Sequence, residues 1–375
     1  MTRILIGGDV CPGGTIEQFF KEGKSEIIFN DLLPLFSSSD YSIVNLECPL
    51  IVHRSPIKKD GRNLGVSVEC INGLKKSHIR AVNLANNHIL DHGEQGLKST
   101  VEALNSADIE WFGAGSCLVE AQKPLVKTIN NSLFVFIGVA EHEFSIAGNN
   151  TWGANPIDII NNLKVIRKYR NEADFLIVLL HGGKEHYPYP TPNLQKTCRF
   201  LIDEGTDVVI CQHSHCAGSY EIYKTKPIIY GQGNLIFERP GKKIASQFEG
   251  VLLSLEFSNI GIDVKFIPYI QSKDIIGARK MSEDDERNFI LALNNRSLNI
   301  LSSEFVEKEW LELCRNEKYL YASRVRGHNR WLRFLNRKLH FTDWLCSEES
   351  HMQIRNVVEC EVHREGLETL WRYNI

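Results

Sequence analysis

Short apolar runs alternate with segments of helical periodicity along most of this 375-residue chain. Apolar runs typical of buried strands occur at residues 3–6, 41–46, 81–84, 109–112, 175–180 and 208–210. Between them, apolar side chains recur at helical spacing in residues 16–36, 68–78, 93–104, 158–169 and 193–204. Strands that alternate with helices predict an α/β fold in which the central strands run parallel.

Two further patterns modify this prediction. Residues 125–129 and 133–139 are expected to pair around Asn130 and Asn131, and a second set of strands at 228–230, 251–257 and 264–269 adds an antiparallel component. From residue 274 onward the chain becomes polar, helix-like and rich in Trp. We therefore expect an α/β domain over residues 1–273 and a mostly helical accessory region over residues 274–375.

Polar side chains that can bind metals stand where the predicted strands end. The stretch Asp207–His215, with the sequence DVVICQHSH, is the clearest case, because a short apolar run ends in two histidines one residue apart. Polar residues also follow the other apolar runs. Together the set comprises Asp9, Glu47, Asn87, His88, His181, His213 and His215. One such residue is more often a cap or a turn residue. Several together, at the edge where open α/β sheets bind ligands, indicate a metal site.

The donor types narrow the choice of metal. A mixture of carboxylate and imidazole suits Zn, Mn or Fe better than it suits Ca or an all-thiolate site. The donors exceed the four ligands of one tetrahedral ion, and they suffice for two ions about 3.5–4 Å apart that share a carboxylate. We therefore expect one or two divalent transition-metal ions as the cofactor.

Composition removes several classes of function. The formal net charge of −3 argues against a nucleic-acid partner for the chain as a whole. The ten cysteines contain no CxxC pair, and the opening MTRILIGGDV predicts a strand rather than a secretory leader. No apolar run approaches the roughly 20 residues of a membrane span. These features predict a cytoplasmic protein with reduced thiols.

A basic segment near the C-terminus leaves two interpretations open. Residues 318–338 hold seven Lys or Arg and no Asp or Glu. Arg326, Arg330, Arg333 and Arg337 fall at helical spacing, opposite the apolar residues Leu332, Leu335 and Leu339. We favour a helix that docks its apolar face on the α/β domain and leaves Arg in solvent. Peripheral contact of residues 318–340 with an anionic membrane surface, at its inner face, is the alternative.

The order of the motifs resembles that of the CapA family of capsule and poly-γ-glutamate biosynthesis proteins, whose fold belongs to the calcineurin-like metallophosphoesterases. The resemblance spans roughly residues 1–270 and rests on the ordered set Gly8–Asp9, Asn45–Leu46–Glu47, Asn86–Asn87–His88, His181, His213–Ser214–His215 and Gly233–Asn234. It implies a four-layer α/β/β/α sandwich. It also implies that Asp9, Glu47 and His215 hold one metal. Glu47, as the bridge, would hold the second together with Asn87, His181 and His213.

The resemblance places His88 beside the substrate rather than on a metal. His88 would protonate the leaving group, and Asp91 three residues later would fix its tautomer. Asp91 as the N-cap of the following helix is an equally good interpretation. The chain departs from the superfamily pattern at Cys11, which stands where a metal-binding His is usual. Cys11 is either a thiolate ligand or a small residue packed under the loop.

These features support three functional hypotheses. The first is a metal-dependent hydrolase for a phosphoester or a γ-linked amide in capsule, exopolysaccharide or poly-γ-glutamate biosynthesis, acting on an anionic polymer precursor or a phosphorylated small molecule. The second is a non-catalytic scaffold of a polymer-synthesis complex, and the third is a general phosphodiesterase. Lys58, Lys59 and Arg62 would bind an anion or form a solvated loop, and Glu185, His186 and Tyr187 would line the pocket or lie in solvent.

Overall fold

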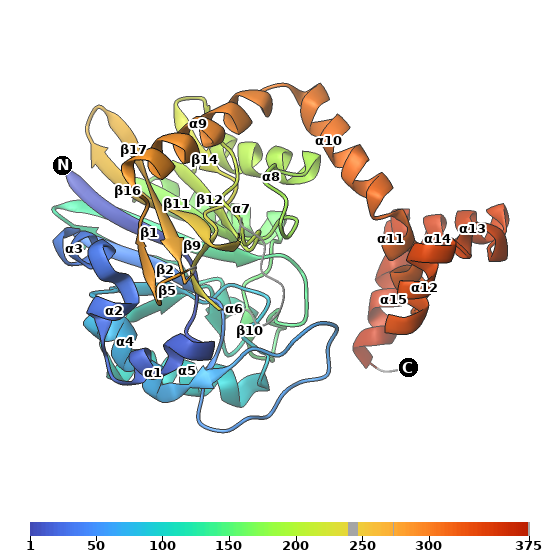
Figure 1. Cartoon of the computed structure of the whole chain (residues 1–375), viewed down its shortest axis with the longest axis horizontal. Coiled ribbons are helices and arrows are strands. Elements are labelled where there is room, and N and C mark those ends of the chain that lie inside the picture. The colour runs from blue at the N-terminus through green and yellow to red at the C-terminus, as the bar shows by residue number, and fades with distance from the viewer. Residues whose placement is uncertain (239–246, 273, 374–375) are drawn as a thin grey trace. The chain divides into compact units, whose positions relative to one another are not determined.

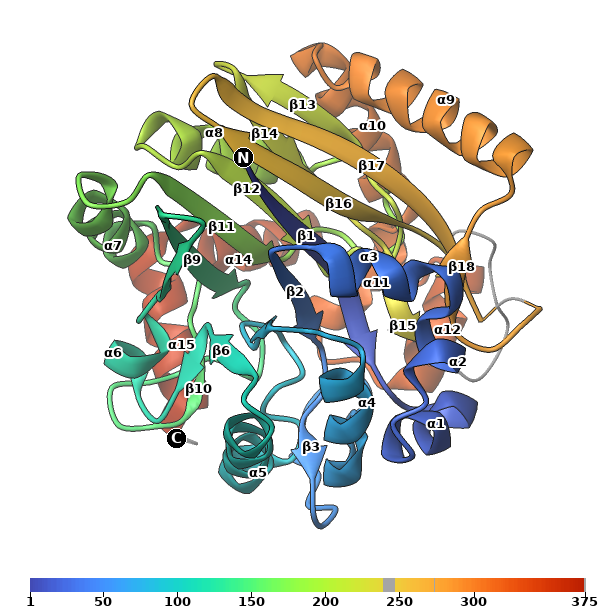
Figure 2. The ribbon, with the colours of Figure 1, turned by 90° about the vertical axis from the view of Figure 1, so that its left-hand side faces the viewer.

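Two β-sheets form the centre of the computed structural model, which describes residues 1–238, 247–272 and 274–373. The first sheet has the order β18 (Ala278–Lys280), β17 (Gly261–Gln271), β16 (Glu249–Ser258), β1 (Thr2–Cys11), β2 (Tyr41–Leu46), β5 (Ala81–Asn83) and β6 (Glu110–Phe112), with β15 (Asn234–Phe237) beside the end of β1. The second has the order β13 (Tyr220–Tyr223), β14 (Lys226–Ile229), β12 (Val208–Gln212), β11 (Phe175–His181), β9 (Ser132–Ala140) and β8 (Leu125–Ile129). Figure 2 shows β17, β16, β1 and β2 side by side.

Alternation along the strands explains why the two sheets pack against each other. In β1, Ile4 and Ile6 belong to the apolar cluster between the sheets, whereas Leu5 belongs to the cluster under the helices. In β11, Ile177 and Leu179 likewise face the other sheet. Successive side chains of a strand point to opposite faces, so a strand that is apolar throughout must be covered on both sides.

Helices cover the outer face of each sheet. The first sheet is covered by α1 (Glu17–Lys21), α2 (Ser25–Phe29), α3 (Leu33–Ser38), α4 (Ile71–Lys76) and α5 (Gly93–Ser106). The second is covered by α7 (Ile159–Arg170) and α8 (Pro192–Asp203). Short pieces complete the connections: α6 (Leu118–Ala121), β3 (Leu50–Ile51) with β4 (Val66–Ser67), and β7 (Ala114–Gly115) with β10 (Gly153–Ala154). The predicted four-layer α/β/β/α sandwich is confirmed (Figure 1).

The single helix predicted for residues 16–36 is wrong. The chain there forms three short α-helices and a 3₁₀ turn at Asn30–Leu32, because Gly23 and Asn30 adopt positive φ angles of 67° and 43° that an α-helix cannot contain. The expected pairing around Asn130 and Asn131 is confirmed, since β8 and β9 are antiparallel and both Asn residues have positive φ.

The chain divides into two compact units, Met1–Val306 and Glu307–Ile375, so the boundary lies later than the expected residue 274. The larger unit keeps β18, which pairs with β17, and α9 (Glu283–Asn299), which packs its Phe289 and Leu293 into the cluster between the sheets. Apolar burial thus ties the segment after residue 274 to the α/β fold.

The smaller unit is helical. It takes most of α10 (Ser303–Asn316) and contains α11 (Lys318–Val325), α12 (Arg330–Leu339), α13 (Thr342–Leu345), α14 (Glu348–Glu359) and α15 (Glu361–Tyr373). The predicted stripe of four arginines is wrong in one member, because the chain turns at Gly327 and Arg326 lies outside α12. Within the described residues, no helix is both long and apolar enough to span a membrane.

Candidate metal centre

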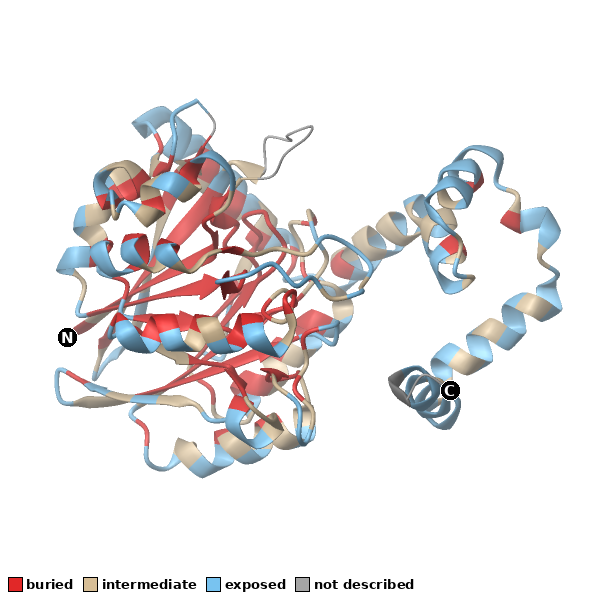
Figure 3. Cartoon of the chain, turned by 90° about the horizontal axis from the view of Figure 1, so that it is seen from below, coloured by how far each residue is buried: buried red, intermediate tan, exposed pale blue. Residues whose placement is uncertain are grey.

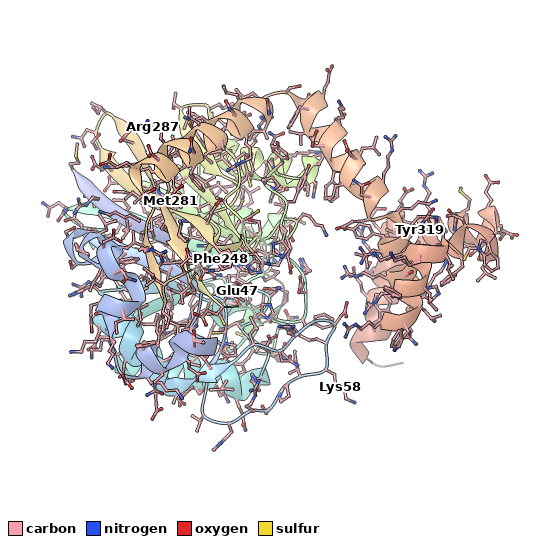
Figure 4. All side chains as sticks on the ribbon, in the orientation of Figure 1. Glu47, Lys58, Phe248, Met281, Arg287 and Tyr319 are labelled. Carbon is pink, nitrogen blue, oxygen red and sulfur yellow. The ribbon has the colours of Figure 1, made fainter. Side chains whose placement is uncertain are left out.

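Five parallel strands bring their polar ends to one place. In the first sheet β1, β2 and β5 run parallel, and in the second β11 and β12 do so. Asp9 lies near the end of β1, Glu47 directly follows β2, and His181 is the last residue of β11. Because the two sheets face each other, these carboxyl ends meet, and Figure 4 shows Glu47 in the interior of the larger unit.

The buried donors form two overlapping groups that share Glu47. Glu47, His181 and His213 make one group, and Asp9, Glu47 and His215 make the other, each with donor atoms within 4.8 Å of one another. Glu47 Oε1 lies 3.5 Å from His181 Nε2 and 3.8 Å from His215 Nε2. A carboxylate shared between two donor groups is the arrangement that a bridged two-metal site requires.

Asn87 joins the first of these groups. Its Oδ1 lies 3.0 Å from His181 Nε2, and its backbone carbonyl accepts a hydrogen bond from Ser145 Oγ at 2.8 Å. The structure therefore brings together all six residues that the sequence nominated as ligands, namely Asp9, Glu47, Asn87, His181, His213 and His215. Their assignment to metal ions stays a prediction.

The electrostatics of the cluster suit a cation. Burial, followed by the charge of Glu47, raises the pKa of Asp9 to about 7. Burial also lowers the pKa of His181 to about 4, so its imidazole is neutral and able to ligate at pH 7. Two buried carboxylates repel each other unless positive charge lies between them, and a divalent ion would supply it. The donor set therefore fits the expected cofactor.

The backbone at the paired histidines is strained. His213 and His215 have φ angles of 90° and 53°, in the left-handed region that costs a non-glycine residue on the order of 1–2 kcal/mol. The backbone N–H of His213 donates to Asp9 Oδ2 at 3.1 Å, which helps to hold this turn against the end of β1. Backbone strain of this kind is concentrated at functional sites in folded proteins, so it agrees with the predicted site.

Amide side chains position the donors, and most of this support was not predicted. Asn45 Nδ2 donates to Asp9 Oδ1 at 2.7 Å, and Asn234 Oδ1 lies 2.7 Å from His215 Nδ1. The Asn234 oxygen accepts the Nδ1 proton, which leaves His215 Nε2 unprotonated and able to ligate a metal. Alternation could have identified Asn45, since it lies in β2 two residues before Glu47 and side chains two residues apart along an extended chain point to the same side.

His88 and Asp91 form a pair beside the cluster. Asp91 Oδ2 lies 2.5 Å from His88 Nδ1 and accepts a hydrogen bond from the backbone N–H of Leu64 at 2.6 Å. Asp91 is not the N-cap of α5, because that position belongs to His92. The capping interpretation is therefore wrong, and the geometry is the one needed to fix the His88 tautomer.

The burial of the Lys59 side chain and its pairing with Asp91 are what sequence reasoning missed on this loop. The Lys59 side chain is only 2% exposed and forms an ion pair with Asp91, and its Nζ lies 3.2 Å from His88 Nδ1. Lys58 and Arg62 on the same loop are exposed, and Figure 4 shows Lys58 on that loop at the edge of the larger unit. The loop is thus not wholly solvated, and anion binding by Lys58 and Arg62 stays a prediction.

Cys11 has the environment of a packing residue. It is buried in the apolar cluster under the first layer of helices, and it belongs to neither of the donor groups found among the described residues. The interpretation as a small packed residue fits this placement better than the thiolate ligand.

With this geometry established, comparisons identify the family. The model of the family described as "Bacterial capsule synthesis protein PGA_cap" matches residues 3–239. The chain belongs to the PGA_cap family. The matched segment begins at β1 and includes all six nominated ligands together with His88, Asp91 and Asn234.

Curated relatives of this PGA_cap protein carry names from capsule and PGA biosynthesis. "Capsule biosynthesis protein CapA" of Bacillus anthracis is 26% identical over 250 residues, which cover 64% of this chain and 60% of the relative. "PGA biosynthesis protein CapA" of Bacillus subtilis (strain 168) is 28% identical over 237 residues, which cover 62% of each. The match thus spans about three fifths of these relatives' length.

Solved structures give weaker similarity. A hypothetical protein from Thermus thermophilus has a TM-score of 0.44 at 14% identity, covering 72% of this chain and 98% of that one. A 5'-nucleotidase from Candida albicans SC5314 has a TM-score of 0.44 at 11% identity, covering 84% and 57%. The family assignment rests on the sequence match.

Proposed function

We propose that this PGA_cap protein is a metal-dependent hydrolase that cleaves a phosphoester or a γ-linked amide during capsule or poly-γ-glutamate synthesis. The observation that carries the proposal is the pair of buried donor groups that share Glu47 at the carboxyl ends of parallel strands. The relatives' names supply the biosynthetic setting. A buried cluster of carboxylates and imidazoles is costly to the fold unless it binds a cation, which favours a metal-dependent enzyme over a scaffold.

Each donor has a proposed role. Asp9, Glu47 and His215 would hold one divalent ion, and Glu47, Asn87, His181 and His213 would hold the other. Bound divalent metals polarise the electrophilic centre of a substrate and activate water at neutral pH. Asn234 keeps His215 in the tautomer whose Nε2 carries no proton, and Asn45 fixes the Asp9 carboxylate.

His88 is the proposed general acid. Its Nδ1 proton is held by the Asp91 carboxylate, so Nε2 is the atom that would give a proton to the leaving oxygen or nitrogen. Lys59 offsets the charge of Asp91 and restricts the carboxylate to one orientation. The His88 side chain is 13% exposed, compared with 0% for Asp91, so the imidazole is the member of the pair that a substrate can reach.

Metal analysis combined with an activity assay tests this function. Purified protein should contain at least one equivalent of Mn, Zn or Fe, and should hydrolyse an aryl phosphate or a γ-glutamyl anilide after metal loading. The ratio of the two rates separates phosphoester from amide chemistry. Protein that binds less than one equivalent and is not activated by added Mn or Zn would contradict the proposal and leave the scaffold as the better explanation.

A further inference from the structure

The helix α12 packs against α11 through polar rather than apolar side chains. Asn336 is buried, and its Nδ2 donates to the Tyr319 carbonyl at 3.1 Å and to Ser323 Oγ at 2.9 Å. The rings of Tyr319 and His340 stack with their centroids 3.9 Å apart at the C-terminal end of α12. Figure 1 shows the two helices side by side. These contacts fix which side of α12 faces the helical unit.

The large apolar side chains of α12 lie on a side that these contacts leave uncovered. At about 100° per residue, they fall within an arc of about 160°. They are 40–76% exposed, and we call them the α12 apolar face: Trp331, Leu332, Phe334, Leu335 and Leu339. A helix that buries an asparagine and exposes its tryptophan and leucines presents an apolar surface to something outside the unit.

Basic side chains occupy most of the rest of α12. Arg330, Arg333 and Arg337 fall within an arc of about 60° on the side away from the α12 apolar face. Lys338 lies within the apolar arc, where its aliphatic stem can run along the face and carry the ammonium group to the edge. The helix therefore has four positive charges and no carboxylate, in a chain whose net charge is −3.

Neighbouring carboxylates leave these charges unneutralised. Arg330, Arg337 and Lys338 form no ion pair with a carboxylate of the described residues. The next carboxylate along the chain, Asp343, accepts hydrogen bonds from Lys318 Nζ at 2.8 Å and from the Tyr319 hydroxyl at 2.7 Å. The positive charge of α12 is thus available to an external anion.

An anionic lipid bilayer matches both parts of this pattern. The ten residues of α12 extend about 15 Å, which is about half the thickness of the hydrocarbon core, so the helix fits along the surface rather than across it. The rings of Trp331 and Phe334 suit the bilayer interface, and the arginines lie at the depth of the lipid phosphates. A groove on a protein would cover the apolar face equally well, but it would not require the opposite side to carry charges of one sign.

We propose that α12 docks on the surface of an anionic lipid bilayer, with its apolar face in the interface and its arginines among the headgroups. The hydrogen bonds of Asn336 hold the helix formed and oriented before it binds, which lowers the ordering cost of docking. The inference is independent of the proposed function, because α12 lies outside Met1–Val306 and outside the matched residues 3–239.

Sedimentation of the full chain with vesicles of equal parts phosphatidylglycerol and phosphatidylcholine tests the apolar face. The unaltered protein should sediment at low ionic strength, and less so as salt screens the headgroups. Trp331→Glu with Leu335→Glu should lower the affinity by about 100-fold or more, because two large apolar side chains no longer enter the interface. The matched control is Val119→Glu with Ile160→Glu on the larger unit, where both side chains are exposed. This control should bind like the unaltered protein.

The same vesicles test the contribution of the cations. Arg330→Gln with Arg337→Gln should lower the affinity by about tenfold or more and reduce its dependence on salt, since each basic residue near an anionic surface contributes to binding. Lys164→Gln with Arg287→Gln removes the same charge from exposed positions of the larger unit and should have little effect. Circular dichroism shows whether each variant keeps its helices.

Quenching of Trp fluorescence by brominated lipid shows whether the face enters the bilayer. Trp331→Phe keeps an apolar ring and should still sediment with the vesicles, but the quenched fraction of the emission should fall. Trp111→Phe in β6 of the larger unit is the control and should not lower the quenched fraction.

Three results would overturn the proposal. The first is failure of the full chain to sediment with the mixed vesicles at low ionic strength, which would favour docking of α12 on the α/β domain. The second is equal binding to phosphatidylcholine alone, or equal quenching in Trp331→Phe. The third is a dimer that becomes a monomer in Trp331→Glu with Leu335→Glu while neither protein sediments, which would assign the face to a second copy of the chain.

Discussion

The strand-end centre and the C-terminal unit make opposite use of polar and apolar residues. In the centre, Asp9, Glu47 and His181 are all at most 1% exposed, on a frame of apolar strands. In the described part of the unit Glu307–Ile375, the buried residues are Ser323, Asn336 and Thr342, whereas Trp331 and Trp344 are 76% and 71% exposed. Figure 3 shows this helical unit mostly in the colours of exposed and intermediate residues. One region buries charge, and the other exposes aromatic surface.

This contrast indicates that apolar packing supports the strand-end centre, whereas hydrogen bonds between polar residues support the helical unit. Burying carboxylates and imidazoles is tolerable only because three apolar layers hold them and a cation can offset their charge. The helical unit has no apolar core of its own among its described residues, so its order depends on a small set of hydrogen bonds. The two regions should therefore respond to different substitutions.

The largest effect is expected for His213→Ala. The substitution removes a donor that lies 3.1 Å from His181 Nε2 in the group that shares Glu47. We expect at least about a 100-fold loss of affinity for the more weakly bound ion, since even outer partners of metal ligands contribute about 10–100-fold. Equilibrium dialysis with Mn or Zn measures it.

His53→Ala is the matched control for that experiment, because His53 is exposed and lies outside both donor groups. Circular dichroism of both variants shows whether the fold persists. Full metal content in His213→Ala would show that the ligand assignment is wrong.

The location of the centre follows from the sequence because it depends on topology alone. Strands 41–46, 175–180 and 208–210 could be recognised from their apolar runs, and parallel strands must bring their carboxyl ends to one edge. Glu47, His181 and His213 could therefore be grouped without knowing any loop. Lys59 could not be grouped with them, since its burial depends on how residues 52–65 return to Asp91, and no local pattern encodes that path.

Lys59→Met should have the next largest effect. Without the ammonium group, Asp91 loses its charged partner and holds His88 less firmly, so kcat on an aryl phosphate should fall by about 10- to 100-fold while metal content stays unchanged. Lys58→Met is the control, because Lys58 is exposed on the same loop. Metal analysis beside steady-state kinetics distinguishes this role from a defect in ligand binding.

A loss of protein stability in Lys59→Met would also lower kcat. A double variant distinguishes the two causes. Leaving Asp91 buried without Lys59 costs on the order of 3–5 kcal/mol, whereas removing both partners avoids most of that cost. Lys59→Met with Asp91→Asn should therefore unfold at a higher denaturant concentration than Lys59→Met alone, yet remain slow. Recovery of the rate together with the stability would show that the pair has only a structural role.

Asn234→Ala should weaken metal binding by about tenfold, because it removes the acceptor that fixes the Nδ1 proton of His215. Asn234→Asp keeps an acceptor at that position and should retain most of the affinity. Competition with a chromogenic chelator measures both. Equal affinities for Asn234→Ala and the unaltered protein would show that the tautomer of His215 is fixed by other contacts.

Sequence reasoning failed at positions where single residues override a periodic pattern. The apolar spacing of residues 16–36 is helical, yet Gly23 and Asn30 take positive φ and divide the segment. Gly327 likewise separates Arg326 from the arginines of α12. The position of α9 was equally inaccessible, because its residues were assigned to the accessory region although Phe289 and Leu293 pack into the cluster between the sheets.

Asn336→Ala is expected to have the smallest effect on metal binding. It should instead destabilise the helical unit. Asn336 donates to the Tyr319 carbonyl and to Ser323 Oγ, and accepts from the backbone N–H and the hydroxyl of Thr342. Removing the amide leaves these buried groups unsatisfied, at about 1–3 kcal/mol each before relaxation. Hydrogen exchange should therefore accelerate in α11, α12 and α13.

The exposed Asn316 offers the matched substitution, Asn316→Ala, which should leave exchange in those helices unchanged. Metal content should be the same in both variants, because the donors and their supporting amides all lie within Met1–Val306. Faster exchange in β11 or β12 of Asn336→Ala would mean that the order of the centre depends on the helical unit, and the contrast between a region stabilised by apolar layers and one stabilised by a few polar contacts would fail.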